Sequence, residues 1–508
     1  MNQLAGFPLL SLVVWLPAIG ALALQLLPAA QTRLIRQVSL AFALAAFLIS
    51  LLVVFGFDRR TTGYQFVDSL PWVPGWGLSY RLSVDGISLW LVILTTFLTP
   101  ISLIASWDTV AKDERLFTTL LLLLASGMTG VFVAQDMLLF YVFFELTLVP
   151  TALLIGRWGG EGRVAAATKF FLYPFAGSVF MLVGIIALYL AHGAQTGVYS
   201  FDHATILASM QLGNLRLDQT TERVLFFLFL AGFIVKVPVW PFHTWMPQAH
   251  EAAPSSGAVD VAGMMIKIGA YGLIRFNIQL FPAAAVWAGP ALATLAVISI
   301  LASAWTAATQ RDMKRVLAYG SISHLGFIVL GIFAIHPLGI AGAVLAMVNS
   351  GITMSALFLI VGMLAQRGNS RDLADFSGVW KAAPILGSLA FVMMMASIGL
   401  PGLNGFIGEF SIMQGAWLSP SIGYGFVTFA AIGVILSAVY MLRMFRMAFM
   451  GDVNGMHMPD LTAREAVLLV TLLVPTIAIG LYPNLIFGPM QTSVNQFAEQ
   501  FGAIVASR

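Results

Sequence analysis

The chain has 508 residues, of which 59% are hydrophobic and 9% are charged. A soluble domain carries about 25% charged residues, so this composition excludes a soluble globular protein and indicates a polytopic membrane protein. Cysteine is absent, which excludes disulfides, thiolate metal sites and a Cys-ligated iron–sulfur cluster in this chain.

Apolar runs long enough to cross about 30 Å of hydrocarbon recur along the whole chain. The first begins at Phe7 with no Lys or Arg before it, so we expect a spanning helix rather than a cleaved signal. We therefore predict an all-α polytopic membrane protein. The sequence indicates about fourteen spans, near 8–29, 35–57, 86–107, 115–134, 137–157, 169–191, 222–237, 257–278, 284–308, 313–335, 339–366, 383–400, 422–449 and 464–487.

Alternation of these spans divides the Lys and Arg residues of the loops into two unequal sets. The larger set has 16 members: Arg33, Arg36, Lys112, Arg115, Arg157, Arg163, Lys169, Arg311, Lys314, Arg315, Arg367, Arg371, Lys381, Arg443, Arg446 and Arg464. The smaller set has 7: Arg59, Arg60, Arg81, Arg216, Arg223, Arg275 and Arg508. The positive-inside rule places the larger set in the cytoplasm and predicts both termini on the outer side. The formal charge of +3 is thus explained by loops and does not indicate nucleic-acid binding.

Two spans are expected to be broken helices. Lys236 ends the apolar run VLFFLFLAGFIVK, and three prolines follow it within eleven residues. Proline removes a backbone donor and clashes with the preceding turn. The second break is GLPGLNGFIGEF, with Glu409 beside it. We expect the second halves of these helices near 243–252 and 404–419.

The two breaks fall at matching places. Spans four to eight and spans nine to thirteen each have the break in the fourth position, a pattern typical of inverted repeats around a midplane ion site. We therefore predict four parts: N-terminal helices at 1–113, a first antiporter-like repeat at 114–280, a second at 281–450, and a C-terminal helix and tail at 451–508.

A few ionisable side chains lie inside the apolar spans: Glu145, Lys236, Asp260, Lys267, His324 and Glu409. Charges in the membrane are costly, and they often mark a path for ions. Glu, Asp, Lys and His can gain or lose a proton, whereas Arg stays charged. The set contains no Arg, which favours a proton relay over a voltage sensor. For each residue alone, the alternative is a structural buried pair or a side chain near a helix end.

Other kinds of site find little support in the sequence. His243 and His250 are seven residues apart, with Glu251 adjacent, but no metal-ligand spacing is present, so a helix-cap or loop role is expected for both histidines. No Walker sequence occurs, so ATP-driven transport by this chain is not expected.

Several stretches resemble the subunit M (chain 4) family of respiratory complex I, which is related to the Mrp cation/proton antiporter subunits. They are QDMLLFYVFFELTLVP, ATKFFLY, KVPVWPFHTWMPQAHEAAPSSG, IKIGAYGLIRFN, RDMKRVLAYGSISHLGFIVLG and LPGLNGFIGEF. The resemblance implies fourteen helices, two of them interrupted. It also implies that Glu145 pairs with Lys236, that Lys267 and His324 continue a hydrated central axis, and that Glu409 is the exit-side acid.

Two positions depart from the family pattern. Relatives commonly carry His in an NHGLS-type stretch where this chain has Ser350, a residue that can order a water but cannot hold a proton. Asp260 stands where an apolar residue is usual. It lies seven residues before Lys267, about 10 Å along a helix, so waters could join the two and make Asp260 a proton-uptake residue. The equal alternative is that Asp260 caps its helix.

The resemblance further implies a pumping subunit of a quinone-reducing complex in a bacterial inner membrane or a cyanobacterial or plastid thylakoid. This chain would carry no cofactor, while quinone, NAD(P)H or ferredoxin, and iron–sulfur clusters would be bound by partner subunits. The expected partners are other membrane-arm subunits, including antiporter-like siblings, and a hydrophilic redox arm. The alternatives are an Mrp-type cation/proton antiporter subunit and an anchoring subunit that no longer pumps. A carbon-dioxide-uptake variant also stays open.

Overall fold

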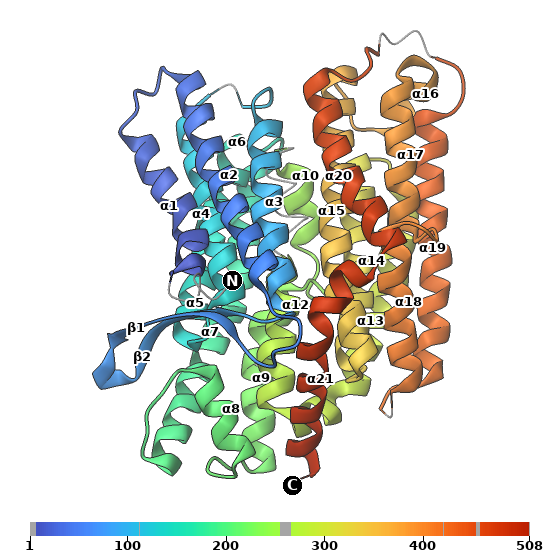
Figure 1. Ribbon diagram of the computed structural model, residues 1–508. Coiled ribbons are helices and arrows are strands. Elements are labelled where there is room, and N and C mark those ends of the chain that lie inside the picture. Colours follow the sequence, from blue (N-terminus) through green and yellow to red (C-terminus); the bar gives the residue numbers. More distant parts are fainter. Residues whose placement is uncertain (1–6, 111, 255–265, 420, 454–457, 507–508) are drawn as a thin grey trace.

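The computed structural model describes residues 7–110, 112–254, 266–419, 421–453 and 458–506 as a bundle of long helices (Figure 1). Ten helices among these residues are long and apolar enough to cross a membrane. Four predicted spans remain. Two are the shorter apolar helices Leu9–Gln25 and Pro384–Ile398. The other two correspond to α9 (Gln219–Lys236) and to α12 (Ile266–Gly272) with the turn that follows it, and the first residues of that last span, 257–265, lie outside the described residues. The predicted fold class is confirmed.

The helices follow the chain in an up-and-down order. The first part contains α1 (Leu9–Gln25), α2 (Thr32–Gly56), α3 (Ser88–Ser106), α4 (Glu114–Val133), α5 (Met137–Leu146), α6 (Leu148–Trp158), α7 (Arg163–Thr196), α8 (His203–Gln211), α9 (Gln219–Lys236) and α10 (Met246–Ala252). The second contains α12 (Ile266–Gly272), the π-helical turn η3 (Leu273–Ile278), α13 (Pro282–Thr309), α14 (Met313–Phe333), α15 (Pro337–Gly368), α16 (Val379–Ala382), α17 (Pro384–Ile398), α18 (Asn404–Leu418), α19 (Tyr424–Phe449), α20 (Ala463–Leu481) and α21 (Asn484–Ala506).

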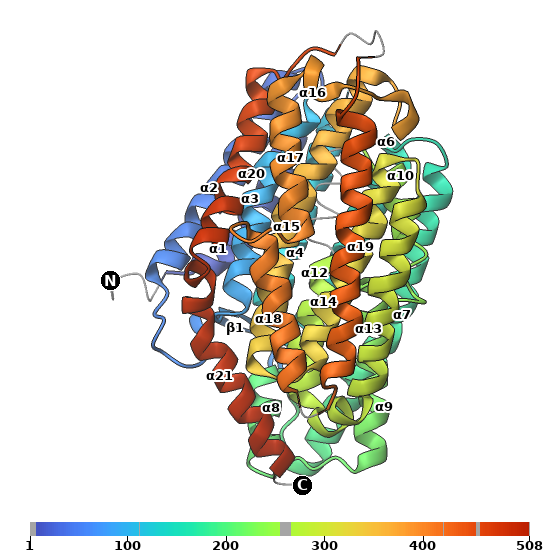
Figure 2. The same cartoon turned by 90° about the vertical axis from the view of Figure 1, so that its right-hand side faces the viewer.

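Both predicted breaks are present, and α10 lies beyond α9 as α18 lies beyond α17 (Figure 1). The first occupies the proline-rich stretch after Lys236. The second passes through Gly399 and Gly402, whose φ angles of 86° and 93° are left-handed and favour glycine. In Figure 2 this second break lies about midway along the bundle.

A weak point in a third span was not predicted. The helix Met137–Trp158 carries Glu145 and is divided into α5 and α6 only at Thr147, whose backbone stays in the right-handed helical region. Pro150 lies four residues after Leu146 and therefore cannot donate to the Leu146 carbonyl, which weakens the helix at this point. This weak point lies immediately beside the candidate site.

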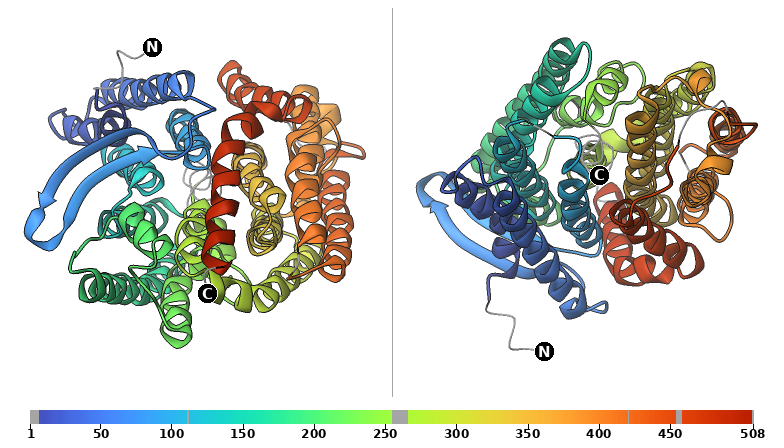
Figure 3. Two further views of the ribbon diagram at one scale, coloured as in Figure 1. Left: turned by 60° about the horizontal axis from the view of Figure 1, so that its bottom comes forward. Right: turned by 90° about the horizontal axis from the view of Figure 1, so that it is seen from above.

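The connection after α2 forms a β-hairpin that the sequence analysis did not predict. Strands β1 (Gln65–Val73) and β2 (Leu78–Val84) pair antiparallel and are joined by a turn at Pro74–Trp76. Figure 3 shows the hairpin along the rim of the bundle, with α21 lying across the same end. The tail of the predicted C-terminal part is helical as far as it is described, because α21 covers Asn484–Ala506.

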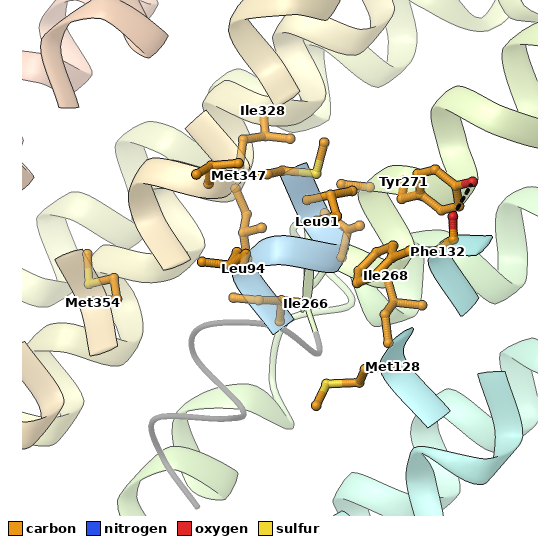
Figure 4. Packing of buried hydrophobic residues seen from close by; sticks show 14 of the residues in the cluster. Leu91, Leu94, Met128, Phe132, Ile266, Ile268, Tyr271, Ile328, Met347 and Met354 are labelled. Atoms are coloured by element: carbon orange, nitrogen blue, oxygen red, sulfur yellow. Dashed lines mark hydrogen bonds between the residues drawn. The ribbon is translucent and has the colours of Figure 1, made fainter. Parts of the chain in front are cut away.

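Apolar side chains from five helices meet in the centre of the bundle (Figure 4). They come from α3, α4, α12, α14 and α15, and include Leu91, Leu94, Met128, Phe132, Ile266, Ile268, Tyr271, Ile328 and Met347. Because lipid is as apolar as these side chains, close van der Waals packing stabilises such contacts in a membrane more than exclusion from water does. This packing joins the helices of the first broken region to those of the second.

Residues from the two predicted sets of loops form ion pairs at opposite ends of the bundle. The end near α16 holds Arg36–Glu114, Arg157–Asp113, Arg367–Glu465, Arg371–Asp312 and Arg464–Asp108. The end near α8 holds Arg81–Asp202 and Arg275–Asp85. This arrangement agrees with the predicted alternation of the spans.

Candidate functional site

The first broken helix ends at Lys236, which is fully buried. Its Nζ donates to the Phe144 carbonyl oxygen at 3.1 Å and to Thr147 Oγ1 at 2.9 Å. The same nitrogen lies 3.5 Å from the centroid of the Phe144 ring, in a cation–π arrangement. Lys236 is therefore held by the point where α5 gives way to α6.

Glu145 is the neighbour of Phe144 on α5 and is half-buried. The hydroxyls of Tyr141 and Ser178 lie within hydrogen-bonding reach of its carboxyl group, and Lys236 is near enough to attract it. The two charged groups are nevertheless not in direct contact, because no Glu145–Lys236 ion pair occurs within 4.0 Å. Glu145 Oε1 is buried without a hydrogen-bond partner among the described residues. The carboxyl group thus has a free acceptor beside a buried ammonium.

Lys267 lies between the two broken regions, on α12, and is 1% exposed. His250 and Lys314 lie near it, close enough for both lysines to act electrostatically on the imidazole. His250 is fully buried and stacks on Phe358, with ring centroids 4.9 Å apart. Neither of its ring nitrogens has a hydrogen-bond partner among the described residues. The expected cap or loop role of His250 is therefore wrong.

Lys314 was counted with the cytoplasmic loops, yet the structure buries it in the first turn of α14. Its Nζ donates to the Ala253 carbonyl oxygen, just after α10. Spacing alone could not reveal this, because Lys314 follows a polar turn in the sequence and only the packing of α10 against α14 encloses it.

The second broken region brings His324 and Glu409 into direct contact. His324 Nδ1 lies 2.9 Å from Glu409 Oε1, and Nε2 lies 3.3 Å from Ser397 Oγ. A cavity of about 30 Å³ adjoins this pair, and Ser350 is among the residues that line it. A water needs roughly 10–15 Å³ of such space, so one or two waters fit beside these polar groups. The predicted residues His324, Ser350 and Glu409 therefore form one site.

An amide cluster extends this site and was missed in the sequence. Asn349 Nδ2 donates to the Asn404 carbonyl oxygen at 2.6 Å, and Thr353 Oγ1 lies 3.4 Å from Asn404 Oδ1. Asn349 Oδ1 and Asn404 Nδ2 are buried with no partner among the described residues, so each can still bond a water. Asparagine inside an apolar span was the available signal, and a search restricted to ionisable residues passes over it.

The structure thus gathers the predicted residues into two groups, with Lys267 between them. Asp260 lies outside the described residues. Within the described ranges no group of three or more His, Cys, Asp or Glu residues could hold a metal ion. The arrangement suits proton transfer, because titratable side chains alternate with hydroxyls, amides and space for water.

Comparison with known proteins gives a consistent result. The family model for "NADH:quinone oxidoreductase/Mrp antiporter, TM" matches residues 134–441, which include both breaks. NADH-quinone oxidoreductase subunit M of Rhodobacter capsulatus is 38% identical, over 97% of this chain and 97% of that protein. NAD(P)H-quinone oxidoreductase chain 4 of Nostoc sp. is 38% identical, over 96% and 90% of the two chains.

Among solved structures, a chain of respiratory complex I from Thermus thermophilus with bound NADH superposes with a TM-score of 0.87. It is 29% identical, and the match covers 97% of this chain and all of that one. The resemblance drawn from the sequence motifs is confirmed. The chain therefore belongs to the NADH:quinone oxidoreductase/Mrp antiporter transmembrane family.

Proposed function

We propose that this chain is a proton-pumping membrane-arm subunit of a complex I-type quinone oxidoreductase. The relatives that match over nearly its whole length are named as subunits of such enzymes. The observation that carries the proposal is the buried His324–Glu409 pair beside a cavity in the second broken region, matched by buried Lys236 in the first. Titratable groups at both breaks are what a proton path across the bilayer requires.

The proposed path has three stages. Glu145 and Lys236 take up a proton in the first repeat, Lys267 passes it toward the centre, and His324 delivers it to Glu409. Ser350 would order a water in the cavity next to Glu409, in the place of a titrating group.

We retain Asp260 as the proposed uptake residue for Lys267, with Asp260→Asn as its test. Unchanged pumping across pH 6–9 would leave helix capping as its role. The proposal also keeps the four predicted parts of the chain, with boundaries after residues 113, 280 and 450.

Electron transfer and quinone reduction are proposed to occur in other subunits. NADH, NADPH or ferredoxin would supply the electrons through iron–sulfur clusters in a hydrophilic arm. Antiporter-like siblings would be the neighbours of this chain in the membrane arm. The host membrane would be a bacterial inner membrane or a thylakoid, with the termini on the outer side, since the larger set of Lys and Arg residues lies at the opposite end.

The test is purification of a tagged chain from its membrane, followed by reconstitution in vesicles. We expect iron–sulfur subunits and antiporter-like siblings to co-purify, and proton translocation to follow addition of an electron donor and quinone. Glu409→Gln should lower the number of protons moved per quinone. An isolated assembly that exchanges sodium for protons without donor or quinone would overturn the proposal and establish the Mrp-type alternative.

A further inference from the structure

Another buried charge cluster lies near α8, outside the two breaks. Arg275 is 3% exposed and Asp85 is 5% exposed. Arg275 Nη2 donates to Asp85 Oδ2 at 2.8 Å, Nη1 donates to Tyr64 Oη at 3.3 Å, and Nε donates to Tyr271 Oη at 3.2 Å. All three nitrogens of the guanidinium group are therefore engaged, and the proposed proton path uses none of these residues.

This cluster is joined to the central lysine by one face of a helix. Lys267, Tyr271 and Arg275 follow each other at intervals of four residues, so they lie on the same side of α12 and η3. At a rise of 1.5 Å per residue, Lys267 and Arg275 are about 12 Å apart along the axis. The π-helical turn that carries Arg275 is an irregularity often found at functional sites.

Beyond Arg275 lies a larger polar cavity of about 210 Å³. Its lining includes Tyr64, Asp85, Arg275 and Gln279 from this cluster, and Ser493 and Gln496 from α21. Since a water occupies about 30 Å³ in the liquid, several waters fit inside. Helix α21 is tied down here, because the Gly86 amide donates to Ser493 Oγ and the Gly63 amide donates to Gln496 Oε1, both at 2.8 Å.

Tyr271 lies between Lys267 and Arg275 on this helix face, and its hydrogen bonds run in one direction. Tyr271 Oη accepts from Arg275 and donates to the Phe132 carbonyl oxygen at 3.2 Å (Figure 4). A carbonyl cannot pass a proton on, and a guanidinium has donors but no acceptor and does not deprotonate. Among the described residues, the hydrogen bonds of Tyr271 and Arg275 therefore offer an excess proton no hopping route from this helix face to the cavity.

We propose that Arg275, oriented by Asp85, is the plug that prevents protons on Lys267 from leaking through the first repeat into the cavity beneath α21. A fixed positive charge in a narrow pore repels protons electrostatically. With this outlet closed, a proton on Lys267 keeps the proposed path toward His324 and Glu409. This inference rests on the proposed function, since a plug matters only if Lys267 carries protons.

The test compares proton leak in vesicles that contain the assembled complex but no electron donor or quinone. The main variant is the double change Asp85→Asn with Arg275→Gln, because removal of Arg275 alone would leave a buried carboxylate unpaired. The double change is neutral in net charge, so its effect comes from replacing a guanidinium, which has donors only, with an amide that can also accept a hydrogen bond. We therefore expect passive proton entry severalfold faster than in the wild type.

Two matched variants separate a plug from a merely structural pair. Arg275→Lys keeps the positive charge and should stay as tight as the wild type, as should Asp85→Asn alone. A double variant that is no leakier than the wild type would overturn the proposal. So would an Asp85→Asn variant that leaks as much as the double variant, because the carboxylate and not the cation would then close the path.

The leak assay also keeps this inference separate from the proposed function. Wild-type vesicles that fail to move protons on addition of donor and quinone would contradict the proposed function, whatever the leak. Normal pumping in the wild type together with an unchanged leak in the double variant would contradict only the plug.

Discussion

The two broken regions bury their charged groups in different ways. At the first, Lys236 is enclosed by a ring face, a carbonyl and a hydroxyl, and it makes no ion pair with Glu145. At the second, Glu409 already bonds His324 next to a cavity with room for water. At the first break, called the enclosed site, the α5–α6 junction must therefore move before Glu145 can contact Lys236. At the second break, called the connected site, Glu409 and His324 are already hydrogen-bonded.

The residues that form each break account for this difference. The prolines after Lys236 restrict the backbone and end α9 at this residue, and its ammonium is held by Phe144 and Thr147 of the neighbouring α5–α6 junction. Glycines form the second break, and they leave space because they carry no side chain. Water or polar side chains must then satisfy the freed backbone groups in that region.

The largest effect is expected at the enclosed site. Lys236→Ala should lower proton pumping and coupled quinone reduction on the order of a hundredfold, since the buried base that ends α9 is lost. Glu145→Gln should act in the same direction. The measurement is proton uptake together with electron-transfer rate in vesicles, with Lys381→Ala as a surface control, because that lysine is 63% exposed. Wild-type stoichiometry in an assembled Lys236→Ala complex would end its role in the relay.

A smaller effect is expected at the connected site. Glu409→Gln keeps an oxygen that can bond His324 but cannot titrate, so pumping should fall roughly tenfold while His324 and water still transfer some protons. Ser411→Ala, two residues along the same helix, serves as the control. If Glu409→Gln blocked turnover as completely as Lys236→Ala, the two sites would not differ in the way that their contacts indicate.

The fold was largely predictable, and the reason is the bilayer. Spanning segments must be long, apolar and helical, so composition and length locate them. Prolines 238, 241 and 247 and the glycines around 402 likewise reveal the breaks. The hairpin at Gln65–Val84 was missed because the requirement for long, apolar helices applies only inside the hydrocarbon. Outside it, this sequence indicates only a polar connection with aromatic residues.

The site was predictable only in part. Ionisable residues inside apolar spans are visible in any sequence, which is why Lys236 and Glu409 were found. The burial of Lys314 and His250 depends on α10 packing against α14, and the sequence does not show which helices are neighbours. The direct His324–Glu409 bond joins residues 85 positions apart and is equally invisible without the fold.

Substitutions of Ser350 test whether the cavity next to His324 and Glu409 is needed for pumping. Ser350→His should slow pumping a few-fold, because an imidazole exceeds a cavity of about 30 Å³ and would displace its water. Ser350→Ala, the matched control, leaves the space open and should pump nearly as the wild type does. The ratio of protons to quinone distinguishes the two. Faster or unchanged pumping in Ser350→His would favour a titrating group at this position over a water.

The smallest effect concerns how the two broken helices begin. Asp218 caps α9 by accepting from the amides of Thr220 and Thr221, whereas α17, which begins the second broken helix, follows Ala383 without a side-chain cap. The hydrogen bond from the Thr221 hydroxyl, followed by those from the backbone amides, lowers the pKa of Asp218 below its usual 3.8. A lowered pKa means that the carboxylate stabilises the folded state above pH 3.8 and that this contribution is lost as the pH falls through the folded value.

Asp218→Ala should therefore speed hydrogen exchange in the first turn of α9 at pH 7, with little change in pumping, because the cap lies far from Lys236 along the helix. Asp218→Asn should exchange nearly as slowly as the wild type, since asparagine caps helices almost as well as aspartate. The advantage of the wild type over Asp218→Ala should shrink below pH 3.8, whereas that of Asp218→Asn should not. Equal exchange in all three proteins at pH 7 would show that tertiary packing alone fixes the start of α9, so that the two broken helices do not differ in this respect.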